Sequence, residues 1–150
     1  MSAPHILVVE AAYYPHIAEL LRRGAERALA AAGASHEYVT VPGAFEIPAA
    51  IAAAARGGRQ FDGYLALGCV IRGETTHYDH ICVESARGLQ DLALREGLAI
   101  GYGILTVENE AQALARADPD RQNGRDKGGE AVRACLALVA VQQRFSASGG

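Results

Sequence analysis

The chain has 150 residues, of which 50% are hydrophobic and 21% are charged, a balance typical of a globular protein. A chain of this length favours one domain with a substantial core, so we expect a single domain over 1–150 with an ordered core of about 5–145. Its net charge of −3 argues against a basic nucleic-acid-binding face. No apolar run is long enough to span a bilayer, so we expect neither nucleic acid nor a membrane as partner.

Cysteine usage and the first residues bear on the cellular compartment. Cys69, Cys82 and Cys135 are an odd number at long spacings, which argues against a disulfide framework and favours a reduced interior. The residues at 1–5 lack the basic and apolar regions of a signal peptide. The sequence therefore predicts a cytoplasmic protein, with a tail at 146–150 that frays.

The first half of the chain alternates between strand and helix patterns. A β-branched run at 6–9 is typical of a buried strand, and apolar residues then recur at helical spacing over 17–29, before Gly33. A second strand is predicted at 37–41, where a Pro-Gly pair ends it. An Ala-rich helix is predicted after Pro48, over 49–56.

The second half continues the alternation. The run at 64–71 is apolar throughout, which predicts a strand buried on both faces. A helix over about 77–96 and a strand over 99–106 follow, and two more helices are expected around 110–117 and 128–145.

Alternating strands and helices, with strands that are continuous apolar runs, indicate βαβ units and a parallel sheet. Four strands and five helices fit an α/β fold, a three-layer αβα sandwich with a flavodoxin-like four-stranded parallel sheet in the order 2-1-3-4. No internal repeat or interdomain linker is visible in the sequence. We therefore predict this architecture for the whole chain.

Polar and aromatic side chains follow each predicted strand. Ligands bind outside the carboxyl ends of the strands in an open parallel sheet, so these segments are expected to form one site. They lie at 11–15, 42–48, 72–77 and 107–109. Together they bring aromatics, carboxylates, threonines and a histidine to one edge of the sheet.

The turn at 73–77 (GETTH) carries the most specific chemistry. Its Gly permits a tight turn, and Thr75 or Thr76 can cap the helix that follows. The free N–H groups and the helix dipole then suit an anion such as phosphate, and His77 is placed to move protons. An alternative interpretation is that Thr76 and Asp79 only cap the helix and that His77 is a surface residue.

Two other kinds of chemistry receive weaker support. His77 and His80 are three residues apart and share a helix face, and with Asp79 they could bind Zn, but no further ligand stands at an accepted spacing, so we expect no metal. Cys69 could pair with His77 as a nucleophile, although a small buried cysteine is the favoured interpretation. No dinucleotide fingerprint or Walker lysine motif is present, and no cofactor is expected.

Arg116 and Lys127 flank a polar loop and could supply cations to a phosphate.

Three segments resemble the 6,7-dimethyl-8-ribityllumazine synthase family. They are 41–48 (VPGAFEIP), 67–79 (LGCVIRGETTHYD) and 103–109 (GILTVEN), and they occur in the family's order. The resemblance runs from about Ile6 to Phe145. It implies the condensation of 5-amino-6-(D-ribitylamino)uracil with 3,4-dihydroxy-2-butanone 4-phosphate, which releases phosphate and water and is the penultimate step of riboflavin synthesis. It also implies that neither a metal nor a redox cofactor is needed.

The resemblance assigns roles to individual positions of this sequence. For ribitylaminouracil it implies an aromatic stack at Tyr13, a ribityl- and pyrimidine-binding turn, a strand end that reads the pyrimidine edge, and an aromatic from a neighbouring subunit. The turn is Ala44, Phe45 and Glu46, the strand end is Cys69, Val70 and Ile71, and the neighbour's aromatic is Tyr102. For butanone phosphate it implies Glu74, Thr75 and Arg116, with His77 as general acid and base. Lys127 falls near a lysine of the family's loop.

The resemblance also implies a homo-oligomer with the site between subunits. The loop at 118–127 is longer than the family's usual form and lacks the short turn associated with icosahedral shells. We therefore expect a pentamer or a dimer of pentamers, with riboflavin synthase as a candidate partner. A non-catalytic flavin- or lumazine-binding protein, or an oligomeric scaffold, remains an alternative because a fold of this kind hosts many functions. A carrier of the ribityllumazine would not need the phosphate turn with His77 and Arg116.

Overall fold

Four parallel strands form one sheet in the order β2-β1-β3-β4 in the computed structural model, which describes residues 3–146. They are β1 (His5–Ala11), β2 (Ser35–Val41), β3 (Gly63–Ile71) and β4 (Ile100–Val107). Strands β1 and β3 are central, whereas β2 and β4 are the edges. The predicted α/β fold and strand order are confirmed.

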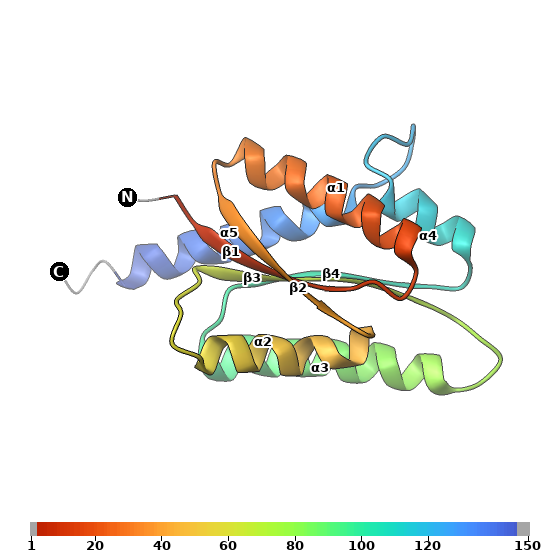
Figure 1. Cartoon of the computed structure of the whole chain (residues 1–150), viewed down its shortest axis with the longest axis horizontal. Coiled ribbons are helices and arrows are strands. Elements are labelled where there is room, and N and C mark those ends of the chain that lie inside the picture. The colour runs from red at the N-terminus through yellow and green to blue at the C-terminus, as the bar shows by residue number, and fades with distance from the viewer. Residues whose placement is uncertain (1–2, 147–150) are drawn as a thin grey trace.

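Helices cover both faces of this sheet (Figure 1). On one face lie α1 (Pro15–Ala31), α4 (Glu110–Ala117) and α5 (Lys127–Ser146). On the other face lie α2 (Ile47–Arg56) and α3 (His77–Glu96). The five predicted helices and the three layers are therefore confirmed.

The central strands are buried on both faces because the side chains at 6–9 in β1 and along most of β3 are apolar. Along β1, Val8 packs with the core under α1 and α5, and its neighbour Val9 packs with the core over α2 and α3. Successive strand residues point to opposite faces, so a continuous apolar run fills two cores at once. This double anchoring fixes the carboxyl ends of β1 and β3, where the polar segments begin.

The element boundaries differ from the predicted ones at several points. The first two strands begin earlier, at His5 and Ser35, and a short 3₁₀ helix (Ala44–Glu46) stands where only a turn was expected. Helix α2 begins at Ile47, so Pro48 lies in its first turn, where a missing N–H costs nothing. The first two residues and 147–150, most of the tail predicted to fray, lie outside the described residues.

Candidate active site

A cavity of about 780 Å³ opens at the carboxyl ends of β1, β2 and β3. Its volume lies within the roughly 300–1,000 Å³ typical of small-molecule sites. Its lining residues come from the three segments that follow these strands and from the first turns of α3. They are Tyr13, Tyr14, Pro42, Gly43, Ala44, Phe45, Glu46, Cys69, Val70, Ile71, Gly73, Thr75, His77, Tyr78, His80 and Ile81.

Most of the residues singled out in the sequence meet in this cavity. Three of the four segments predicted to form one site, those after β1, β2 and β3, converge with His77 at the cavity wall, whereas the segment after β4 does not line this cavity. Glu74 is exposed and is not among the lining residues, although its neighbours Gly73 and Thr75 are. The aromatic rings of Tyr13 and Phe45 are 70% and 54% exposed, so two apolar surfaces are available to a ligand.

Tyr14 is a wall residue to which the sequence analysis gave no role. Its ring meets that of Tyr13 edge to face, with centroids 5.0 Å apart and an angle of 71° between the planes. Burial raises the pKa of the Tyr14 hydroxyl, and a hydrogen bond with the Ile71 backbone acts in the opposite direction. Tyr14 therefore packs against the core on the α1 and α5 face of the sheet, and its ring contacts the exposed ring of Tyr13.

The turn before α3 is partly as predicted. The hydroxyl of Thr75 accepts a hydrogen bond from the backbone N–H of His77, with 3.3 Å between Oγ1 and N. Thr76 occupies the N-cap position but makes no side-chain cap hydrogen bond, so Thr75 takes the interaction instead. Asp79 lies within 3.5 Å of Arg72. Thr76 therefore does not cap the helix through its side chain, whereas His77 is exposed, as the alternative interpretation expected.

The alternative chemistries gain no support from the geometry. Cys69 is 8% exposed, and burial raises the pKa of its thiol to about 12, so the thiolate that a nucleophile needs is disfavoured. This favours the interpretation of Cys69 as a small packed side chain. Within residues 3–146, no three His, Cys, Asp or Glu side chains converge closely enough to hold one metal ion.

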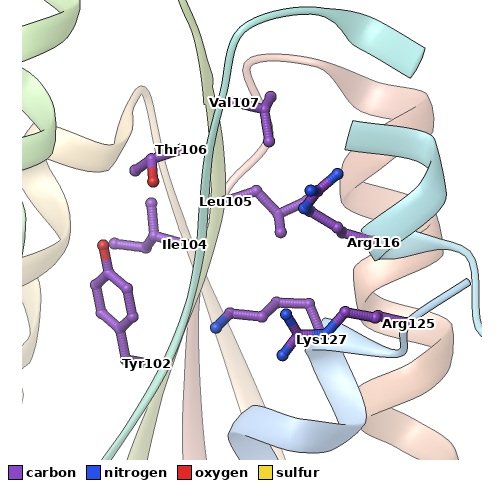
Figure 2. Close-up of a pocket in the computed structure, with 8 residues that line it drawn as sticks. All are labelled: Tyr102, Ile104, Leu105, Thr106, Val107, Arg116, Arg125 and Lys127. Carbon is purple, nitrogen blue, oxygen red and sulfur yellow. The ribbon is translucent and has the colours of Figure 1, made fainter. Parts of the chain in front are cut away.

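A second, smaller cavity of about 180 Å³ lies along the edge strand β4 (Figure 2). It is lined by Tyr102, Ile104, Leu105, Thr106, Val107, Arg116, Arg125 and Lys127. Figure 2 shows the Lys127 side chain extending toward β4, with the ring of Tyr102 across the strand, and Nζ of Lys127 lies 5.6 Å from the centroid of that ring.

The two cavities divide the predicted site residues between them. Tyr102, Arg116 and Lys127 line the small cavity, whereas Thr75 and His77 border the large one, and the two share no lining residue. Within one chain, Arg116 and Lys127 therefore do not line the same cavity as the turn before α3. Spacing along the sequence gave no signal for this separation, because it depends on how α4 and α5 pack at the β4 edge.

Close packing between α1 and α5 places Lys127 at the mouth of this cavity. A Cβ atom at Gly128 would lie 2.1 Å from the Leu21 carbonyl oxygen, so only glycine lets α5 begin directly against α1. On the adjoining helix α4, Nη1 of Arg116 donates to the Gln112 carbonyl oxygen over 3.0 Å. The Arg116 guanidinium is thus held by neighbouring backbone, and the backbone at Lys127 is fixed by the contact of Gly128 with α1.

The fold and the cavity define an α/β protein with a flavodoxin-like sheet and a cavity of small-molecule size at the carboxyl ends of its strands. Residues 3–143 match the sequence model of the 6,7-dimethyl-8-ribityllumazine synthase family, and the chain belongs to this family. The predicted family resemblance is therefore confirmed.

Individual relatives are similar over nearly their whole length. A 6,7-dimethyl-8-ribityllumazine synthase of Sphingopyxis alaskensis is 60% identical over 141 residues, which cover 94% of this chain and 96% of the relative. The 6,7-dimethyl-8-ribityllumazine synthase 1 of Rhizobium meliloti is 55% identical, covering 95% and 94%. The corresponding protein of Agrobacterium fabrum is 52% identical, covering 97% and 99%. No helix in the described part of the chain is long and apolar enough to cross a bilayer.

Proposed function

We propose that this chain condenses 5-amino-6-(D-ribitylamino)uracil with 3,4-dihydroxy-2-butanone 4-phosphate to 6,7-dimethyl-8-ribityllumazine. Its membership of the synthase family, with matches over nearly the full length, supports this activity. The structural observation that carries the proposal is the large cavity. It gathers nine of the residues to which the family resemblance gives a role, including His77.

The large cavity suits the ribitylaminouracil. Tyr13 and Phe45 offer exposed aromatic faces on which a pyrimidine ring can stack. The end of β3 at Cys69, Val70 and Ile71 presents backbone N–H and C=O groups to the ring edge. We assign the ribityl chain to the turn that contains Glu46, whose carboxylate can accept hydrogen bonds from hydroxyl groups.

The turn before α3 suits the phosphate of the second substrate. Backbone N–H groups of Glu74 and Thr75 lie just ahead of the helix, whose positive dipole end favours an anion. Arg116 and Lys127 supply the opposing cations. Because one chain keeps these cations in a separate cavity, we assign them to the site of a neighbouring subunit, together with Tyr102.

A complete site thus requires an oligomer. We propose a pentamer or a dimer of pentamers in the cytoplasm, because the loop that precedes α5 is long and charged. Riboflavin synthase is a candidate partner, since it would consume the product. Light scattering on the purified protein measures the assembly mass, and the mass of a full icosahedral shell would contradict this assignment.

The reaction requires the protein mainly to position the two substrates and to transfer protons. The exocyclic amine of the pyrimidine attacks the ketone, a Schiff base forms with loss of water, phosphate leaves, and ring closure with loss of water completes the lumazine. Holding two reactants in register lowers such a barrier by up to about 7–11 kcal/mol. Proton transfer by His77 adds about 10²–10⁴-fold.

The test is an absorbance and fluorescence assay with both substrates and the purified assembly. The expected result is lumazine formation well above the rate in a control without protein, since the condensation also proceeds unaided. Tight binding of the ribitylaminouracil with no acceleration would favour the alternative of a non-catalytic binding protein or scaffold. Family membership favours the enzyme, and a carrier has no use for a phosphate-binding turn.

A further inference from the structure

The small cavity holds a third cation to which neither the family resemblance nor the proposed function gives a role. Arg125 lines this cavity with Arg116 and Lys127, and no carboxylate is among the lining residues (Figure 2). At about 180 Å³ the cavity is smaller than the roughly 300–1,000 Å³ of sites for whole small molecules. Its size and charge suit an anionic substituent.

The loop that carries Arg125 is seated on α4 close to Arg116. The backbone N–H of Arg125 donates to the Ala115 carbonyl oxygen over 2.8 Å. A Cβ atom at Gly124 would lie 2.7 Å from the same oxygen, so glycine is needed for this close approach. The position of Arg125 beside Arg116 is therefore set by backbone contacts.

Glu130, one helical turn into α5, holds the Arg125 guanidinium by one edge. Nε of Arg125 donates to Oε2 over 3.2 Å, and Nη2 donates to Oε1 over 2.6 Å. The guanidinium beside it lowers the pKa of Glu130, so this carboxylate stays charged at neutral pH. An arginine has five N–H donors, so a second edge of the guanidinium stays free for another acceptor.

We propose that Arg125 is a phosphate-binding residue of the condensation, which contacts the phosphate group of the butanone substrate through this free edge. The inference rests on the proposed function and extends it, because it adds a residue from the long loop to the cations at Arg116 and Lys127. A planar guanidinium fixed on one edge loses little freedom when it binds an anion, and two parallel N–H groups match two phosphate oxygens.

The test compares Arg125→Gln with Arg121→Gln, which removes the same charge from the same loop at a residue that lines neither cavity. Steady-state kinetics on the assembled enzyme should show a KM for the butanone phosphate about tenfold higher in Arg125→Gln. The KM for the ribitylaminouracil should stay within about twofold of the wild type. Arg121→Gln should match the wild type for both substrates.

A binding measurement separates this inference from the proposed function. Titration calorimetry with inorganic phosphate on the assembled wild type, Arg125→Gln and Arg121→Gln should show weaker binding only for Arg125→Gln. Equal phosphate affinities and equal KM values in the two variants would overturn the role of Arg125, whatever the activity. A wild type that binds phosphate but forms no lumazine would instead contradict the proposed function. Light scattering verifies that each variant assembles.

Discussion

The guanidinium of Arg72 joins the carboxyl ends of β3 and β4, since its Nε donates to Oε2 of Glu108 over 2.8 Å. The same group lies 4.3 Å from the centroid of the Tyr78 ring, in the first turn of α3. Two strands and the helix that carries His77 are thus tied together at the edge of the large cavity. Arg72 therefore connects the sheet to the proposed proton-transfer group.

Replacing Arg72 with Gln should loosen this connection. The Arg72 and Glu108 side chains are 40% and 55% exposed, so the ion pair and ring contact together contribute about 1 kcal/mol or less to stability. We expect a fall of that size in the free energy of unfolding, measured with urea, and a kcat lower by about threefold because the first turn of α3 is less fixed. Arg87→Gln, on the outer side of α3, is the matched control and should leave kcat unchanged. Equal kcat values in both variants would contradict the connection.

Removing the imidazole of His77 should slow the reaction without stopping it. Positioning of the two substrates remains in His77→Ala, and only the proton-transfer contribution of about 10²–10⁴-fold is lost. The measurement is single-turnover lumazine formation, with the rate in the absence of protein subtracted. His36→Ala, which removes an imidazole from the opposite end of β2, is the control and should retain the wild-type rate. A correctly assembled His77→Ala protein with no residual acceleration would contradict this division of labour.

Tyr13 should act through its ring rather than its hydroxyl. Stacking of a base on an aromatic side chain contributes about 1–3 kcal/mol, so Tyr13→Ala should raise the KM for the ribitylaminouracil about tenfold. Tyr13→Phe keeps the ring and its edge-to-face contact with Tyr14, and its KM should stay near that of the wild type. If the two variants had equal KM values, the ring would not be the binding surface.

The sequence predicted the sheet well because β1, β3 and β4 are largely apolar runs that only a sheet covered on both faces can bury, whereas the edge strand β2 is half-exposed. Around Pro48 the prediction was less accurate. A residue before proline is biased away from the helical region, yet Ile47 is helical, and Pro48 occupies the first turn of α2. Residues of three strand ends could be assigned to one cavity from the rule for parallel sheets. The separate cavity of Arg116 and Lys127 could not, because it depends on α4 and α5 meeting the β4 edge.

Alkaline pH should destabilise the fold through its buried thiols. Burial raises the pKa of Cys69 from 9.0 to about 12 and that of Cys135 from 9.0 to about 11. At a pH between the ordinary thiol pKa of 9.0 and these raised values, the two thiols have lost their protons in the unfolded chain but keep them in the folded chain. The free energy of unfolding therefore falls as pH rises above about 9. Below pH 9 both states keep the thiols protonated, and this contribution to stability is fully present.

Urea unfolding from pH 8 to pH 11 measures this slope. The double variant Cys69→Ala and Cys135→Ala should lose less stability over the range than the wild type, even where its stability at pH 8 is lower because of the lost methylene-sized volume. The tyrosines titrate in both proteins, so the difference between the two slopes isolates the thiols. Identical slopes would show that the two thiols titrate normally in the folded state.

Mixed assemblies test whether the two cavities belong to one active site. His77→Ala damages only the large cavity and Arg116→Gln only the small one, so each homogeneous assembly should have low activity. If a site combines the large cavity of one chain with the small cavity of its neighbour, random co-assembly of equal amounts restores about one site in four. Two affinity tags allow purification of particles that contain both chains before the assay.

The control is a mixture of His77→Ala with Tyr13→Ala, whose altered residues line the same cavity, so no neighbour pairing yields an intact site. Activity above the average of the two homogeneous assemblies in the first mixture, and equal to that average in the second, is the expected result. No gain over the average in the first mixture would place the cations of Arg116 outside the shared site.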